Sequence, residues 1–134
     1  MIGKIITIKG GEISESATER FMESARMHGV TDIVNLFRFD AIVPDQVQPT
    51  MKKLKLSWNY PWKGSVFDMK SGLQKSAYQT NAPHRRIACF LSHYLLWKEC
   101  AEKEESIFVF EHDALFTAPL PLEILQESKY TVIG

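Results

Sequence analysis

The first forty residues alternate between short apolar runs and a polar segment with helical spacing. Residues 4–8 (Lys-Ile-Ile-Thr-Ile) are rich in β-branched side chains and end before Gly10, a pattern typical of a buried strand followed by a turn. Residues 16–19 (Ser-Ala-Thr-Glu) have capping-box spacing and predict a helix start, and Gly29 stands where a left-handed cap would end that helix. Residues 33–39 predict a second strand. A strand, a helix and a strand with short connections favour a parallel pair.

The middle of the chain gives weaker signals. Residues 44–56 could hold a short helix, in which Pro49 would introduce a break or kink. Residues 57–82 show no sustained period of either kind, and such a long stretch in a small domain is typically functional or mobile. It includes residues 58–62 (Trp-Asn-Tyr-Pro-Trp), which form either a platform for a sugar or base ring or a pin that holds the loop to the core.

Regular patterning returns with a long helix and a strand. Residues 84–103 place apolar side chains on more than half of the helical circumference, which predicts burial against more than one neighbour, with Ser92 on the solvent side. Residues 107–110 (Ile-Phe-Val-Phe) are typical of a central strand covered on both faces, and residues 130–133 predict one more strand. Alternating strands and helices predict an α/β layered fold with a mostly parallel sheet, in a single domain over residues 1–134.

Composition narrows the class of protein. The chain has 134 residues, of which 45% are hydrophobic and 24% charged, as in one ordinary soluble domain. Sixteen Lys and Arg balance sixteen Asp and Glu, so nucleic-acid binding is disfavoured. No apolar stretch reaches the roughly 20 residues that cross a bilayer, and the N-terminus lacks the pattern of a signal peptide. Cys89 and Cys100 are expected on one helix as free thiols, which favours a cytoplasmic location.

The strongest candidate for chemistry is the triplet Glu111, His112 and Asp113, which directly follows the strand at residues 107–110. Ligands of parallel α/β sheets bind beyond the carboxyl ends of the strands. In extended geometry Glu111 and Asp113 would project to the same side. Two carboxylates that close favour a cation between them, and their hard oxygen atoms suit Mg²⁺ or Mn²⁺. Alternatively, these acids cap a following helix or face solvent.

The long helix offers weaker candidates. His93 lies one helical turn from Cys89, which makes a metal pair one interpretation, and a core histidine bonded to a backbone carbonyl the other. Ser92 and His93 diverge by about 100° as helical neighbours, so they cannot form a nucleophile–base pair. Residues 84–86 (His-Arg-Arg) form either an anion site at the helix start or a solvated helix end.

In their order along the chain, these motifs resemble the glycosyltransferase family 25 domain, which includes lipooligosaccharide (LPS) glycosyltransferases. Residues 87–93 (Ile-Ala-Cys-Phe-Leu-Ser-His) are similar to the Ser-His helix of the family, and residues 107–114 to its hydrophobic strand and acidic triplet. The first strand, with Arg20 in the helix after it, resembles the family's opening segment. The match is weak between about residues 44 and 80, and His112 replaces the middle Asp of the family motif.

The resemblance implies a GT-A-like, Rossmann-like αβα fold whose N-terminal half binds a nucleotide sugar. Glu111 and Asp113 would hold Mn²⁺ or Mg²⁺, with Asp113 the best-matched metal ligand. The metal would bridge the diphosphate of a donor such as a UDP-hexose. The residues that would bind or neighbour this donor are Thr7, Arg20, Ser92, His93 and Glu111.

The implied function is the transfer of a galactose-like hexose from this donor to a glycan acceptor with inversion, as in LPS biosynthesis. Family domains are longer, so we expect a minimal version or the donor-binding portion, and uncovered apolar surface would favour a homodimer. No residue is assigned as the general base. The alternatives are a non-catalytic nucleotide-sugar or glycan-binding module and, from the residues alone, a metal-dependent hydrolase built from Glu111, His112, Asp113 and His93.

Overall fold

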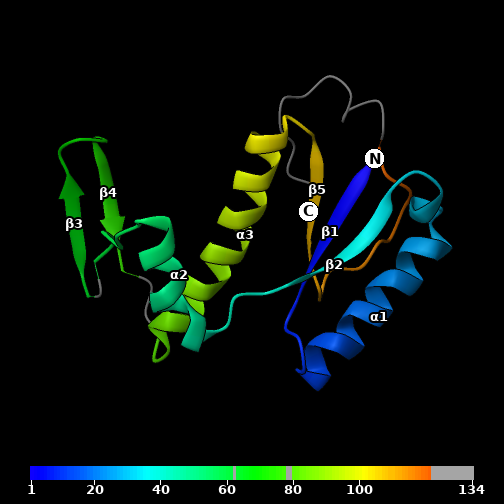
Figure 1. The fold of residues 1–134 in the computed structure, drawn as a ribbon, viewed down its shortest axis with the longest axis horizontal. Helices are drawn as coiled ribbons and strands as arrows, with labels where there is room; N and C mark the ends of the chain where they lie inside the picture. Colours follow the sequence, from blue (N-terminus) through cyan, green and yellow to red (C-terminus); the bar gives the residue numbers. More distant parts are fainter. Residues whose placement is uncertain (62, 78–79, 122–134) are drawn as a thin grey trace. The chain divides into compact units, whose positions relative to one another are not determined.

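The computed structural model describes residues 1–61, 63–77 and 80–121, and the chain forms two compact units (Figure 1). The first unit comprises Met1–Asp40 and Cys100–Gly134, and the second comprises Ala41–Glu99. Parallel strands and α-helices alternate in the first unit, which confirms the predicted α/β class. The elements are β1 (Ile2–Thr7), α1 (Glu12–Met27), η1 (Val30–Asp32), β2 (Asn35–Asp40), η2 (Pro44–Gln46), α2 (Val47–Leu54), β3 (Ser65–Asp68), β4 (Leu73–Ser76), α3 (Pro83–Lys103) and β5 (Ile107–Glu111).

The sheet of the first unit has the strand order β2-β1-β5, and both neighbours run parallel to β1. The predicted parallel pair of the first two strands is thereby confirmed, and so is the left-handed residue after α1, Gly29, with φ 66°. β1, rather than β5, is the central strand of the described sheet, and the side chains of residues 107–110 are half-buried. The strand predicted at residues 130–133 lies outside the described residues.

The core of the first unit lies between α1 and the sheet. Phe21 of α1 is 1% exposed and packs with Ile5 of β1, which is fully buried. The ring of Phe21 lies 5.1 Å from that of Phe110 and 5.3 Å from that of Phe116. The helix therefore rests on the sheet through its apolar face, while its charged side chains, apart from the half-buried Glu15, are exposed.

The turn between β1 and α1 is held by side chains at the start of the helix. The N–H of Ile8 donates to Ser14 Oγ at 2.8 Å, and the N–H of Gly10 donates to Glu15 Oε1 at 2.7 Å. The capping box predicted at residues 16–19 is therefore wrong, because α1 begins at residue 12. Ser14 and Glu15 accept backbone hydrogen bonds of the kind that was expected of Ser16 and Glu19.

The second unit packs α2 against the first half of α3. Val47, Ile87, Ala88 and Leu91 form its buried core. Pro49 does not break α2, since it lies in the first turn, where a backbone N–H has no intrahelical acceptor to lose. The prediction of a short helix is confirmed, and the predicted kink is wrong.

Residues 57–82, predicted without regular structure, contain the antiparallel hairpin β3–β4. Asp68 holds its turn by accepting hydrogen bonds from the Lys70 N–H and the Ser71 hydroxyl, both at 3.0 Å, and by an ion pair with Lys75 at 2.6 Å. These contacts, the Lys75 hydrogen bond first, lower the pKa of Asp68 to about 2. The sequence pattern missed the hairpin because its side chains do not alternate, and Val66 and Phe67 are both 54% exposed.

The long helix predicted at residues 84–103 is confirmed as α3. Its apolar face is narrower than predicted, since Phe90 and Trp97 are exposed, and Ser92, expected in solvent, is fully buried. Cys89 and Cys100 both lie on α3 and are free thiols, as predicted. Among the described residues, none of the helices is both long and apolar enough to cross a bilayer.

Candidate functional site

The carboxyl ends of β1, β2 and β5 meet at one edge of the first unit's sheet. Thr7 is the register partner of Asp40, and Ile6 is the register partner of Glu111. One polar residue from each strand therefore lies at this edge, which we call the carboxyl edge (Thr7, Asp40 and Glu111). Ligands of open parallel α/β sheets bind beyond such an edge.

The acidic triplet begins at the carboxyl edge and continues into a turn. β5 ends at Glu111, and the N–H of Ala114 donates to the Glu111 carbonyl at 3.2 Å. His112 and Asp113 therefore do not continue the strand, and the expectation of extended geometry through Asp113 is wrong. The turn, not the strand pleat, sets the direction of the Asp113 carboxylate. Glu111 and Asp113 are both exposed.

His112 is held in place by the neighbouring strand. Its Nδ1 lies 3.3 Å from the carbonyl oxygen of Ile6. With the proton on Nδ1, this contact is an N–H···O hydrogen bond that orients the ring and leaves the Nε2 lone pair available as a ligand. The substitution of His for a middle acid thus adds a fixed imidazole between two exposed carboxylates.

The donor atoms at this edge are compatible with a hard divalent ion. No three His, Cys, Asp or Glu side chains of the described first unit bring their ligand atoms within 4.8 Å of one another. A closed protein cage is therefore not formed there. Mg²⁺ and Mn²⁺ do not require one, because Mg²⁺ is usually held by one or two carboxylates together with substrate phosphates and water. Glu111 and Asp113 fit that arrangement.

Asp40, the last residue of β2, also lies at this edge, although it is not among the site residues predicted from the sequence. Its carboxylate pairs with Lys9 Nζ at 3.2 Å, and both side chains are largely exposed. The signal was weaker than at Glu111, since Asn35 and Arg38 interrupt the apolar residues before Asp40, whereas four consecutive apolar residues precede Glu111. Lys9 and Asp40 place one cation and one anion at the carboxyl edge, beside the end of β1.

Two predicted donor-binding residues of the first unit are engaged in contacts within the fold. Thr7 is 3% exposed, and its hydroxyl lies 2.8 Å from the hydroxyl of Thr18 on α1. Arg20 is exposed on α1 and donates to Ser16 Oγ, one turn earlier, at 3.0 Å. Thr7 reaches the carboxyl edge through its backbone, and its side chain ties β1 to α1.

Ser92, in the second unit, has its hydroxyl fully used. It accepts the Ile42 N–H at 2.9 Å and donates to the Ala88 carbonyl at 2.9 Å, with no exposed surface. The hydroxyl thus fastens the segment after β2 to α3. This structural role explains why a small polar side chain occurs on the buried face of the helix.

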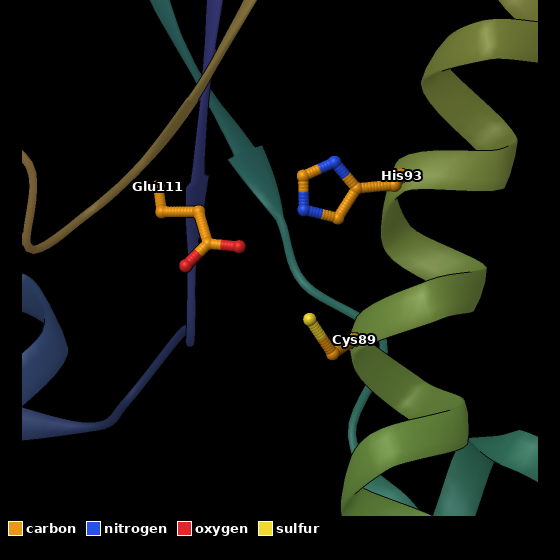
Figure 2. Close-up of side chains that lie close together, drawn as sticks. All are labelled: Cys89, His93 and Glu111. Atoms are coloured by element: carbon orange, nitrogen blue, oxygen red, sulfur yellow. The ribbon is translucent and has the colours of Figure 1, made fainter. Parts of the chain in front are cut away.

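Cys89 and His93 project from the same side of α3, one turn apart (Figure 2). Cys89 is exposed, and the half-buried ring of His93 lies 5.9 Å from that of Trp97. The spacing expected for a metal pair on this helix is therefore present. Figure 2 also draws Glu111, which belongs to the first unit and extends from the end of β5.

Comparison with known proteins identifies a family for this chain. A family model described as glycosyltransferase family 25 (LPS biosynthesis protein) matches residues 15–130. The matched range includes β2, α3, β5 and the acidic triplet. No curated protein and no solved structure matches the chain.

Proposed function

The chain belongs to glycosyltransferase family 25, and from this premise we propose that it transfers a hexose from a nucleoside diphosphate sugar to a glycan acceptor. The observation that carries this proposal is the position of the acidic triplet. From β1 the chain passes to β2 on one side, and β5 lies on the other side, so the strand order reverses at β1. Glu111 ends β5 at this switch point, where open α/β sheets bind nucleotides.

The described sheet also supports a finer proposal about the fold. A parallel β2-β1-β5 sheet with α1 packed on it is the arrangement expected of the nucleotide-binding half of a GT-A-like domain. In this proposal, the turn after β1 and the acidic turn after β5 flank the diphosphate of a UDP-hexose. The side chains beside it are then Lys9, Asp40, Glu111, His112 and Asp113.

Glu111 and Asp113 are proposed as the carboxylates that hold Mn²⁺ or Mg²⁺ against the donor diphosphate. When bound, such an ion neutralises the charge that develops on the leaving nucleoside diphosphate. His112, oriented by the Ile6 carbonyl, is positioned to present Nε2 at the same edge. Lys9 adds a positive charge that attracts the diphosphate.

Calorimetric titration of UDP with and without Mn²⁺ tests the donor site. We expect binding that weakens at least about tenfold, or about 1.4 kcal/mol, when Mn²⁺ is chelated. Asp113→Asn should remove this metal dependence, and the fold should survive because the side chain is exposed. The matched control is Asp32→Asn, which neutralises an exposed carboxylate before the start of β2, away from the carboxyl edge. A UDP affinity that changes neither on removal of Mn²⁺ nor in Asp113→Asn would refute the proposed site.

Turnover distinguishes an enzyme from a binding module. Release of UDP from UDP-galactose or UDP-glucose in the presence of a glycan acceptor, lost in Asp113→Asn and kept in Asp32→Asn, is the expected result. Metal-dependent UDP binding without any transfer or hydrolysis would support the non-catalytic nucleotide-sugar module instead. The two outcomes share the same donor site and differ only in chemistry.

A further inference from the structure

The second unit contains two adjoining cavities that share three lining residues. One has a volume of about 440 Å³ and the other about 340 Å³, and Trp58, Tyr60 and Arg86 line both. The larger is also lined by Ile87 and Leu91 of α3, which belong to the buried core. We call the pair the aromatic pocket. All its described lining residues belong to the second unit.

The walls of the aromatic pocket include aromatic side chains that remain partly exposed. Trp58 is half-buried and lies 6.0 Å from Tyr60 and 5.8 Å from Phe90, measured between ring centroids. Tyr60 is 42% exposed and Phe90 is 39% exposed. If these rings served only to pin the loop to the core, we would expect them to be covered. A pocket lined by apolar core residues and partly exposed aromatic rings fits a flat molecule with an apolar face.

The charge of the second unit is strongly positive. Residues 41–99 contain nine Lys and Arg against three Asp and Glu, a net charge of +6, which the rest of the chain balances with −6. Arg86 and Lys63 line the aromatic pocket, and no acid is among its described lining residues. One of the three acids, Asp68, is already paired with Lys75. The field at the pocket therefore favours an anion.

We propose that the aromatic pocket binds the acceptor, as a sugar ring that carries a carboxylate or phosphate group. The apolar face of the ring lies against the aromatic side chains, and the anionic group meets Arg86, with Lys63 near the smaller cavity. Ser57 and Asn59 at the pocket wall supply donors and acceptors for sugar hydroxyls. The assignment as acceptor rests on the proposed function, since a glycosyltransferase needs a glycan site besides its donor site.

Binding measurements on the full chain without metal or donor test this proposal. The probes are sialyllactose for the carboxylate, glucose 6-phosphate for the phosphate, lactose as a neutral sugar, and UDP. We expect at least one anionic sugar to bind about tenfold or more tightly than lactose, and its affinity to fall as salt rises. The stronger of the two anionic arms identifies the group that is recognised.

Arg86→Gln, with Arg85→Gln as its matched control, locates the interaction. The two arginines are neighbours on α3 and exposed, but only Arg86 lines the pocket. Arg86→Gln should weaken anionic-sugar binding about tenfold, and Arg85→Gln should have little effect. Tyr60→Ala, at an exposed ring, should weaken all sugars.

Three results would overturn the proposal. They are equal affinity for lactose and both anionic sugars, equal effects of the two arginine variants, and metal-free UDP that displaces the bound sugar. The last would make the pocket a nucleotide site. Each is independent of the metal-linked UDP titration, so the acceptor pocket can fail while the donor site stands, or the reverse.

Discussion

Thr7 and Thr18 form a buried hydroxyl pair that a double-mutant cycle can test. Their Oγ1 atoms are 2.8 Å apart, and the Thr18 hydroxyl also donates to the Ser14 carbonyl at 3.0 Å. The arrangement that uses each proton once has Thr7 donating to Thr18 and Thr18 donating to Ser14. Thr7 is 3% exposed and Thr18 is 0% exposed, so water cannot replace a lost bond.

The magnitude follows from the number of bonds that each substitution removes. A neutral hydrogen bond contributes about 1 kcal/mol net, so Thr7→Val, which keeps the shape, should lower the free energy of unfolding by about 1 kcal/mol. Thr18→Val removes two bonds and should cost about 2 kcal/mol. The double variant should lose about 2 kcal/mol rather than 3, a coupling of about 1 kcal/mol.

Urea unfolding of the four proteins, followed by far-UV circular dichroism, measures this coupling, and Mn²⁺-linked UDP binding is measured alongside. Single costs that add to within about 0.3 kcal/mol would show that the hydroxyls do not interact and would refute the reasoning. If Thr7→Val leaves stability unchanged and weakens UDP binding, the side chain lines the nucleotide pocket, as the resemblance implied. The cycle thus separates a structural role from a binding role.

Three further predictions test other parts of the fold. In Gly3→Ala, the new Cβ would lie 2.7 Å from a Leu36 methyl carbon and 2.9 Å from one of Val34, so unfolding should become easier by about 1–3 kcal/mol, and an unchanged urea midpoint would contradict this crowding. Because the pKa of Asp68 is lowered from 3.8 to about 2, its contribution to the hairpin should be complete above pH 3.8 and lost as the pH falls through about 2. The Lys70 amide resonance should follow that step, which Asp68→Asn should abolish. Pro49→Ala should change stability by less than about 1 kcal/mol, and a much larger loss would mean that Pro49 does more than start α2.

Local patterning predicted the elements that local physics dictates. The strands before and after α1, their parallel pairing, the left-handed Gly29 and the long helix α3 all follow from apolar periodicity and turn chemistry. The predictions fail where a tertiary contact determines whether a side chain is buried or whether an element forms. Ser92 is polar and was placed in solvent, yet the Ile42 amide gives its hydroxyl a buried partner. The hairpin β3–β4 depends on Asp68 contacts within a stretch that has no alternation.

The candidate site depended on register more than on pattern. An acid ends a strand at Glu111 and again at Asp40, but only at Glu111 is that strand continuously apolar, so the sequence pattern points to Glu111 alone. Periodicity tells which face of a sheet a side chain occupies, but not which strand ends are neighbours. Once β2 and β5 pair with β1 in parallel, both acids must lie at one edge, with Lys9 beside Asp40.

Net charge, like periodicity, does not tell which residues are neighbours in space. A net charge of zero over the whole chain disfavours nucleic-acid binding, but it does not describe the charge of each unit. Electrostatic attraction depends on the charge near the binding surface, because ions in solution screen charges beyond about 8–10 Å at physiological salt. The division into two units turns zero into +6 for residues 41–99 and −6 for the remainder. The proposed anionic ligand of the aromatic pocket would therefore bind to a unit of net positive charge, and the proposed divalent cation to a unit of net negative charge.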